Sequence, residues 1–359
     1  MAFNGSLTEI MNAFAIEFDV DPYGDGHIND TYIADSSPRY ILQRINTSIF
    51  TNPEKLMENI LAVTEHLRKV IAQNGGNPDR ETLTVIKTED GKLYYESADG
   101  NCYRMYKFID NTISLNLPEN PEQFESSAKA FGKFQNMLAD FDASTLYETI
   151  PDFHNTPKRT INLKKALEDN IAGRKDEIMD VYNAYMQFEN DCAIITQDLE
   201  SGKIPTRVTH NDTKLNNVLF DKDTRDGLCV IDLDTVMPGS LLFDYGDSLR
   251  FGASTAAEDE ADLDKVWFNL EYFESYTKGF LSELGDKITA REIELLPLSA
   301  LTLTYECGIR FLTDYLNGDT YFKIHYPDQN LVRAKNQLKL CQDITTKLEE
   351  MKKIVAKYV

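Results

Sequence analysis

The sequence predicts an α+β protein of two lobes, a small N-terminal lobe with an antiparallel sheet and a larger, mainly helical C-terminal lobe. Short strand-like runs separated by turn residues gather in residues 1–110. Apolar residues at helical spacing dominate residues 122–359. Between them, residues 111–121 are polar and carry two prolines, so we interpret them as a hinge or connector.

In the N-terminal lobe, Ser6 and Glu9 have capping-box spacing and open an expected helix over residues 6–18. A second helix is expected over residues 53–72, where Pro53 occupies a favoured first position. Strands are expected in "PRYILQRIN", "TLTVIKT", "LYYES" and "CYRMYKFI", with a turn at Glu89-Asp90-Gly91.

The C-terminal lobe begins with an apolar stripe over residues 122–141. Residues 205–236 form an island of short strands and loops within this helical half. The other expected helices cover residues 161–173, 176–200, 261–284, 288–316 and 330–357.

The composition limits the partners. The 37 basic and 59 acidic residues give a formal net charge of −22, which argues against nucleic acid or an anionic membrane as the main partner. ATP remains compatible, because a bound cation reverses the local sign. The 5 cysteines form no C-x-x-C pair, and we see neither a signal peptide nor a membrane span. We therefore expect a cytoplasmic monomer with reduced thiols.

Polar side chains cluster in "THNDTKLNNVLF", where His210, Asp212 and Asn217 form an H-x-D-x₄-N pattern ahead of an apolar strand. Asp232 ends the next strand, so it returns beside Asn217 if the two strands pair as a hairpin. Oxygen ligands from two chain segments suit Mg²⁺, which takes its remaining ligands from phosphate and water. Asp212 would then contact the attacking hydroxyl.

Protein kinases use the same order of residues, with a catalytic Asp, a metal-binding Asn and a second metal-binding Asp. Here no A-P-E segment follows, and Leu233 and Asp234 stand where Phe-Gly would be. The chain instead resembles the aminoglycoside phosphotransferase-like small-molecule kinases, which have a bilobal protein kinase-like fold. "PYGDGHIN", "RYILQ", "IDLDTVMPGSLLFDYGDSLRFGAST" and "ECGIRFLTDYLNGD" resemble more closely the N-acetylhexosamine 1-kinase family. The resemblance spans about residues 20–335.

This resemblance implies transfer of the ATP γ-phosphate to the anomeric C1 hydroxyl of GlcNAc or GalNAc. Asp212 would orient that hydroxyl and accept its proton, and Lys214 would contact the γ-phosphoryl group. Asn217 and Asp232 would hold Mg²⁺. For Asp234 two roles stay open, as a ligand of a second metal ion or as a residue that steadies the loop. The implied partners are ATP and an amino sugar.

For the nucleotide, Gly24 and Gly26 stand where the glycine-rich loop of a kinase belongs, although an ordinary hairpin turn would look the same. The strand that should carry the phosphate-binding lysine shows Gln43 and Arg44 instead, and strand parity does not decide which of the two points inward. The strand over residues 104–110 would be the hinge strand whose backbone meets adenine. The candidate nucleotide-binding residues are Gly24, Gly26, Arg44, Tyr106 and Phe108.

For the acceptor, the resemblance implies that His27, Arg310 and Phe251 bind the sugar. A plain loop role for His27 stays open, as do an ion pair or core packing for Arg310 and Phe251. We expect Asp244 and Asp247 to cap a helix and His210 to brace its loop. His154 and the other remaining histidines show no ligand spacing and are interpreted as surface or core residues.

Two alternatives remain. The first is a kinase of the same fold for another small alcohol, such as an aminoglycoside, homoserine, choline or a different sugar. The negative charge favours a cationic acceptor, but we locate no cluster of acids in the helical lobe, and the single tryptophan, Trp267, gives little support for a choline cage. The second is a non-catalytic nucleotide-binding or regulatory protein. Intact Asp212, Asn217 and Asp232 argue against it.

Overall fold

The computed structural model describes residues 6–24 and 28–359, which divide into two compact units. The sheet unit comprises the chain up to Ile113 together with two later segments, Asp140–Pro151 and Leu219–Pro238. The helical unit comprises Ser114–Ala139, Asp152–Val218 and Gly239–Val359. The first boundary falls inside the segment that the sequence suggests as a connector.

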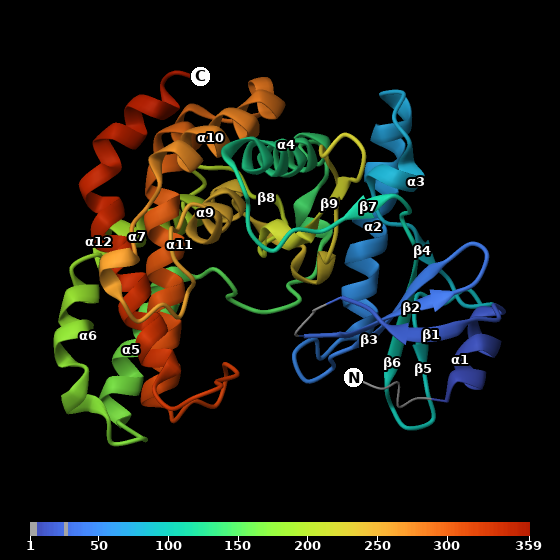
Figure 1. Cartoon of the computed structure of the whole chain (residues 1–359), viewed down its shortest axis with the longest axis horizontal. Helices are drawn as coiled ribbons and strands as arrows, with labels where there is room; N and C mark the ends of the chain where they lie inside the picture. Colours follow the sequence, from blue (N-terminus) through green and yellow to red (C-terminus); the bar gives the residue numbers. More distant parts are fainter. Residues whose placement is uncertain (1–5, 25–27) are drawn as a thin grey trace. The chain divides into compact units, whose positions relative to one another are not determined.

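The sheet unit is built on a six-stranded sheet with the strand order β1-β2-β3-β6-β4, in which β5 also pairs with β6 (Figure 1). Every pairing in this sheet is antiparallel, which confirms the predicted α+β architecture. The strands are β1 (Asp19–Pro22), β2 (Asp30–Asp35), β3 (Tyr40–Ile45), β4 (Val85–Ile86), β5 (Tyr95–Glu96) and β6 (Cys102–Lys107).

Helices cover the two faces of this sheet through alternating strand residues. Helix α1 (Leu7–Phe14) shares one buried cluster with Tyr103 and Met105 of β6. On the other face, Nη1 of Arg104 lies 3.9 Å from the sulfur of Met57, which belongs to α2 (Pro53–Gln73). The short helix α3 (Pro78–Glu81) follows α2.

Register settles which residues of β3 share a face. Gln43 stands opposite Arg104, and Arg44 stands opposite Tyr103. Directly opposed residues of antiparallel strands project to the same side. Gln43 therefore lies on the face of α2, and Arg44 lies on the face that α1 covers.

A second sheet orders β10 (Gly227–Val230), β9 (Val218–Asp221) and β7 (Thr112–Ile113). The two strands around the polar motif are thus neighbours, as the sequence suggested. The turn between them is closed by the hydrogen bond from the Asp221 N–H to the Asp226 carbonyl, at 2.9 Å.

The helical unit confirms the predicted helix-rich half of the chain. Three expected ranges differ in detail. Residues 176–200 break into three short helices, and the helix expected from residue 261 starts at Leu270, after an Asn269 cap. The helix expected over residues 161–173 instead spans Thr156–Asp169, after an Asn155 cap. The helices are α4 (Pro121–Met137), α5 (Thr156–Asp169), α6 (Met179–Met186), α7 (Glu189–Cys192), α8 (Ile194–Glu200), α9 (Leu241–Gly252), α10 (Leu270–Leu284), α11 (Ala290–Leu316) and α12 (Gln329–Val355). Strand β8 (Arg207–Thr209) lies in this unit, and β11 spans Met237–Gly239. Among the described residues, no helix is long and apolar enough to cross a membrane.

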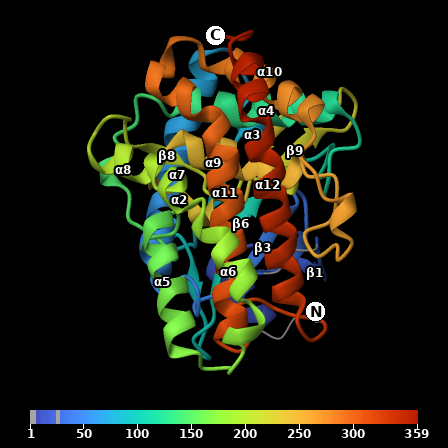
Figure 2. The ribbon, with the colours of Figure 1, turned by 90° about the vertical axis from the view of Figure 1, so that its left-hand side faces the viewer.

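Helices α11 and α12 run beside each other in the helical unit (Figure 2). Helix α11 begins with a complete capping box formed by Thr289 and Glu292. At Gly308 its backbone comes so close to the Tyr185 side chain that any Cβ would overlap the phenol ring. The Tyr185 hydroxyl donates to the Ala334 carbonyl of α12 at 2.5 Å, so the ring is fixed in this position.

Replacing Gly308 with Ala is expected to lower the free energy of unfolding by about 1–3 kcal/mol, because the added methyl group overpacks this contact. Urea denaturation followed by circular dichroism measures the change. The control is Lys335→Ala on the exposed side of α12, which should stay within about 0.5 kcal/mol of the wild type. Equal stability of both variants would contradict the close packing at Gly308.

Candidate active site

The helical unit brings together three of the predicted site residues on the loop between β8 and β9, the two predicted catalytic residues and one predicted metal ligand. Nζ of Lys214 lies 2.9 Å from Oδ1 of Asp212. Nδ2 of Asn217 donates to the Asp212 carbonyl oxygen at 2.7 Å and to its Oδ2 at 3.3 Å. Since the amide nitrogen of Asn217 faces Asp212, its Oδ1 is the atom oriented for a ligand.

The charges of this pair reinforce each other. Burial by itself would raise the pKa of the Asp212 carboxyl, but the Lys214 ammonium outweighs burial and brings that pKa below its usual value. The Asp212 carboxylate in turn raises the pKa of Lys214. The side chains keep 24% and 40% exposure, so the ionised carboxylate remains open to a substrate.

Buried acids of α9 hold the backbone of this loop. Asp244 accepts hydrogen bonds from the N–H groups of His210 at 2.9 Å and Asn211 at 2.7 Å. Asp247 accepts from the N–H of Thr213 at 3.1 Å. The prediction that Asp244 and Asp247 cap a helix is therefore wrong: α9 is capped by Ser240, and both acids lie inside it.

His210 braces the loop, as predicted. Its Nδ1 accepts a hydrogen bond from the Asp212 N–H at 3.2 Å. The ring is completely buried and meets Phe131 and Phe134 edge-on, at centroid distances of 5.7 and 6.1 Å. A group enclosed in this way positions Asp212 and does not face a substrate.

In the sheet unit, Asp232 follows β10 with a left-handed φ of 58°. Asp234, two residues later, is buried, and both of its carboxylate oxygens are engaged. Oδ1 forms an ion pair with Nη1 of Arg104, and Oδ2 accepts from Nδ2 of Asn29 at 2.6 Å. Of the two roles left open for Asp234, this geometry favours the one that steadies the segment.

Arg104 was not among the predicted site residues. It is 1% exposed and donates through Nε to Oε1 of Gln43 at 3.0 Å. The signal for it was an arginine inside the otherwise apolar run "CYRMY". Arg44 lies on the other face of the sheet, where its Nε donates to Oδ2 of Asp30 at 2.7 Å, so the geometry does not favour Arg44 as a phosphate contact.

The remaining nucleotide candidates also belong to the sheet unit, where the ring of Tyr23, next to Gly24, lies 5.8 Å from that of Phe108. Gly24 has a φ of +71°, in the left-handed region that favours glycine, while Gly26 and His27 lie outside the described residues. Tyr106 is buried, and the guanidinium carbon of Arg104 lies 5.3 Å from the centroid of the Tyr106 ring. Burial raises the pKa of the Tyr106 hydroxyl. The Phe108 N–H already donates to the Arg39 carbonyl at 3.0 Å.

Among the acceptor candidates, Arg310 of α11 lies among three aromatic rings. Its guanidinium carbon is 5.7, 5.9 and 5.4 Å from the ring centroids of Phe153, Tyr321 and Phe322. Burial and the neighbouring Arg310 charge lower the pKa of Arg159. Within the described part of the chain, neither arginine forms an ion pair with a carboxylate.

The aromatic loop beside Arg310 is fixed by a buried acid. Oδ1 of Asp314 accepts from the N–H of Tyr321 at 2.8 Å, and Oδ2 accepts from the N–H of Phe322 at 2.9 Å. Phe251, the other predicted sugar contact, is half-buried near the end of α9. The backbone that carries two of the three rings around Arg310 is thus held in place.

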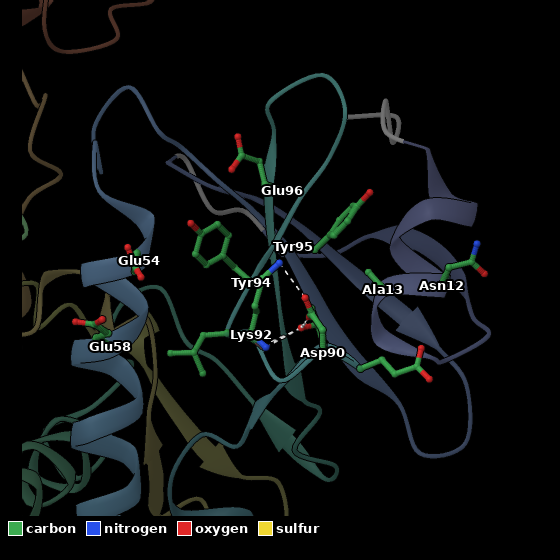
Figure 3. A pocket seen from close by; sticks show the side chains of 12 residues that line it. Asn12, Ala13, Glu54, Glu58, Asp90, Lys92, Tyr94, Tyr95 and Glu96 are labelled. Carbon is green, nitrogen blue, oxygen red and sulfur yellow. Dashed lines mark hydrogen bonds and ion pairs between the residues drawn. The ribbon is translucent and has the colours of Figure 1, made fainter.

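The sheet unit contains a hollow (Figure 3). It is lined by α1, α2 and the segment from Thr88 to Glu96, and most of its charged groups are acidic. None of its lining residues belongs to the candidate site. They are Asn12, Ala13, Glu54, Glu58, Thr88, Glu89, Asp90, Lys92, Leu93, Tyr94, Tyr95 and Glu96.

Similarity to solved structures defines the class of fold to which the protein belongs. The structure resembles an aminoglycoside phosphotransferase from Alicyclobacillus acidocaldarius, with a TM-score of 0.59 and 12% identity over 94% of this chain and 92% of that one. A spectinomycin phosphotransferase gives 0.58 and 14% over 98% and 100%, and a microcompartment-associated aminopropanol kinase gives 0.56 and 15% over 93% and 94%. These likenesses show the fold of the small-molecule kinases.

The family follows from the sequence match. The model of the phosphotransferase enzyme family matches residues 19–275, which is more than half of the chain. The chain belongs to the phosphotransferase enzyme family.

Replacing Arg104 with Met is expected to destabilise the protein by about 3–5 kcal/mol, because Asp234 is left as a buried carboxylate without its ion-pair partner. Denaturant unfolding followed by fluorescence gives the value. Arg44→Met is the matched control, since the Arg44 side chain is 44% exposed and its ion pair with Asp30 should contribute at most about 1 kcal/mol. Similar losses in the two variants would contradict the role assigned to Arg104.

Proposed function

We propose that the protein is an ATP-dependent kinase that phosphorylates the anomeric C1 hydroxyl of N-acetylhexosamines, GlcNAc or GalNAc, to give the sugar 1-phosphate. The observation that carries the kinase proposal is the arrangement of Asp212, Lys214 and Asn217, an accessible carboxylate flanked by an ammonium and an amide on one loop. Membership of the phosphotransferase enzyme family supports the reaction class.

Asp212 is the proposed base. It orients the acceptor hydroxyl and takes its proton as the bond to phosphorus forms. Its lowered pKa makes it a weak base, which suits an anomeric hydroxyl, since that group is more acidic than an ordinary alcohol. Lys214 lies beside it and is proposed to neutralise charge on the transferring phosphoryl group.

Asn217 and Asp232 are the proposed ligands of Mg²⁺. The donor set fits this cation, because the Asn217 amide is oriented with Nδ2 toward Asp212 and a carboxylate would complete a pair of hard oxygen ligands. Among the described residues, no group of three His, Cys, Asp or Glu side chains is arranged to hold a metal ion. The other ligands would therefore come from ATP phosphates and water. The bound ion would neutralise charge on those phosphates.

Two relatives support ATP as the donor. The spectinomycin phosphotransferase structure contains ADP, and a structure of amicoumacin kinase contains AMP-PNP and Ca²⁺. We propose that Gly24, Gly26, Tyr106 and Phe108 contribute to the nucleotide site, with Gly24 in a conformation that lets the backbone approach a ligand closely.

The acceptor is proposed to be neutral and rich in oxygen. Arg159 and Arg310 put two positive charges in one region, and such a region repels a cationic amine. Arg310 has donors for sugar hydroxyls or the N-acetyl carbonyl, and the nearby rings offer an apolar face to a pyranose. His27 and Phe251 remain proposed sugar contacts.

The experiment that tests this function is an acceptor panel with ATP and Mg²⁺. The panel contains GlcNAc, GalNAc, glucose, galactose, kanamycin, homoserine and choline, and phosphate transfer to each is measured. The proposal expects GlcNAc or GalNAc to react fastest. Faster transfer to kanamycin or choline would replace it with a kinase for cationic acceptors.

Asp212→Asn should lower kcat by about 10²–10⁴-fold, because the amide cannot accept the hydroxyl proton. Binding of ATP should change little, and isothermal titration calorimetry of each variant checks this. Asp191→Asn, on the exposed surface of α7, is the control and should keep the wild-type rate. A kcat near the wild-type value in Asp212→Asn would refute the base assignment.

Arg310→Met should raise the KM for the sugar by about 10-fold or more, because a charged hydrogen bond to the acceptor is lost. The KM for ATP should stay within about twofold of the wild type. Arg333→Met is a matched control, since Arg333 of α12 also lies over an aromatic ring, that of Phe311, at 5.4 Å. Equal shifts of both KM values would mean that Arg310 is structural.

A further inference from the structure

His154 lies in the helical unit, just ahead of α5, and joins two distant parts of the chain. Its Nδ1 is 2.7 Å from Oε1 of Glu306, and its Nε2 is 3.0 Å from the carbonyl oxygen of Asn211. The side chain is 7% exposed, and the ring packs against Phe153 and Phe243 at centroid distances of 4.7 and 5.2 Å. These contacts join residues far apart in the sequence, and they correct the interpretation of His154 as an ordinary surface or core residue.

Both atoms that face the His154 nitrogens are hydrogen-bond acceptors. A carbonyl oxygen only accepts, and Glu306 accepts on its other oxygen from the Thr156 hydroxyl at 2.7 Å, as an ionised carboxylate does. A neutral imidazole has one N–H and would leave one of these contacts without a proton. Only the imidazolium form donates to both neighbours.

The Asn211 carbonyl belongs to the residue directly before Asp212. Asn211 has a left-handed φ of 66°, and its N–H donates to Oδ1 of the buried Asp244. Its peptide groups are therefore held on both sides, the N–H by Asp244 and the carbonyl by His154. This fixes the direction in which the chain enters Asp212.

We propose that His154 is a positioning residue: as a buried imidazolium it links Glu306 of α11 to the Asn211 carbonyl and thereby orients the Asp212 carboxylate. The proposal rests on the proposed function only in the role of Asp212. The charge state of His154 can be measured without any activity.

The charged groups around His154 agree with this. Burial by itself lowers the pKa of the imidazole, but Glu306, with a smaller contribution from Asp247 of α9, raises it above its usual value. Arg310 lies one helical turn beyond Glu306 and, together with His154, favours the ionised form of the Glu306 carboxyl. Because the pKa is raised, the imidazolium form and both hydrogen bonds are retained to a higher pH than in an ordinary histidine, and they are lost as the pH rises through that raised value.

The direct test is NMR of the full-length protein labelled with ¹⁵N on its histidines, with His154→Gln used to assign the signal. Both ring nitrogens of His154 should carry protons at pH 7.5, whereas the imidazole of a histidine in a short unstructured peptide, the reference, is mostly neutral there because it titrates near pH ~6.5. A single protonated nitrogen on His154 at pH 7 would overturn the proposal. This result is independent of whether any acceptor is phosphorylated.

Kinetics tests the positioning role. His154→Phe should lower kcat by about 10–100-fold with KM values changed less than threefold, and His154→Gln, which keeps an N–H donor, should lose less. In Asp212→Asn the further change His154→Phe should have little effect, because the base it orients is already gone. An unchanged kcat in folded His154→Phe, or equal losses in both backgrounds, would refute a role exerted through Asp212.

Discussion

The conformation of the loop that carries Asp212 depends on hydrogen bonds between side chains and the backbone N–H and C=O groups of the loop. Residues between β8 and β9 cannot use a regular ladder, so their N–H and C=O groups require side-chain partners once they are buried. Asp244 and Asp247 accept the N–H groups, and His154 is proposed to donate to a carbonyl. Local order at Asp212 therefore comes from three distant side chains.

In the sheet unit, another charged pair, Arg104 and Asp234, likewise holds a loop segment in place. Asp232 is followed by a short irregular turn, and Arg104 holds that turn through Asp234. In each unit a buried charged pair supports a carboxylate that is more accessible than the pair. Arg104 and Asp234 support Asp232 in the sheet unit, and His154 and Glu306 support Asp212 in the helical unit. Breaking a buried charged pair costs several kcal/mol, so the acids in such pairs hold the structure. The two acids that we assign to chemistry are therefore not the most deeply buried ones.

Much of the fold was predictable because local patterns of residues in the sequence predict its helices and strands. The positions of strands β3 and β6 and the helical stripe of α4 follow from the sequence alone. The H-x-D-x₄-N spacing likewise predicted that Asp212 and Asn217 would meet, and the structure brings them into contact. Loop position and residue type were enough for this part of the candidate site.

The partners of these residues were not predictable, because they are distant in sequence. Arg104 and Asp234 are 130 positions apart, and His154 and Asn211 are 57 apart. Acids near the start of a helix usually cap it, yet Asp244 turns toward a neighbouring loop. The parity of Gln43 and Arg44 also needed the register with β6, which no pattern within β3 supplies.

The most direct test of the account is a crystal structure of the protein with GlcNAc, Mg²⁺ and a non-hydrolysable ATP analogue. The measurement is the distance from the C1 hydroxyl oxygen to the nearer carboxylate oxygen of Asp212. The account predicts about 2.6–3.2 Å, with the cation bound by Asn217 Oδ1 and Asp232. A sugar bound with another hydroxyl at Asp212, or a cation bound away from those two residues, would contradict it.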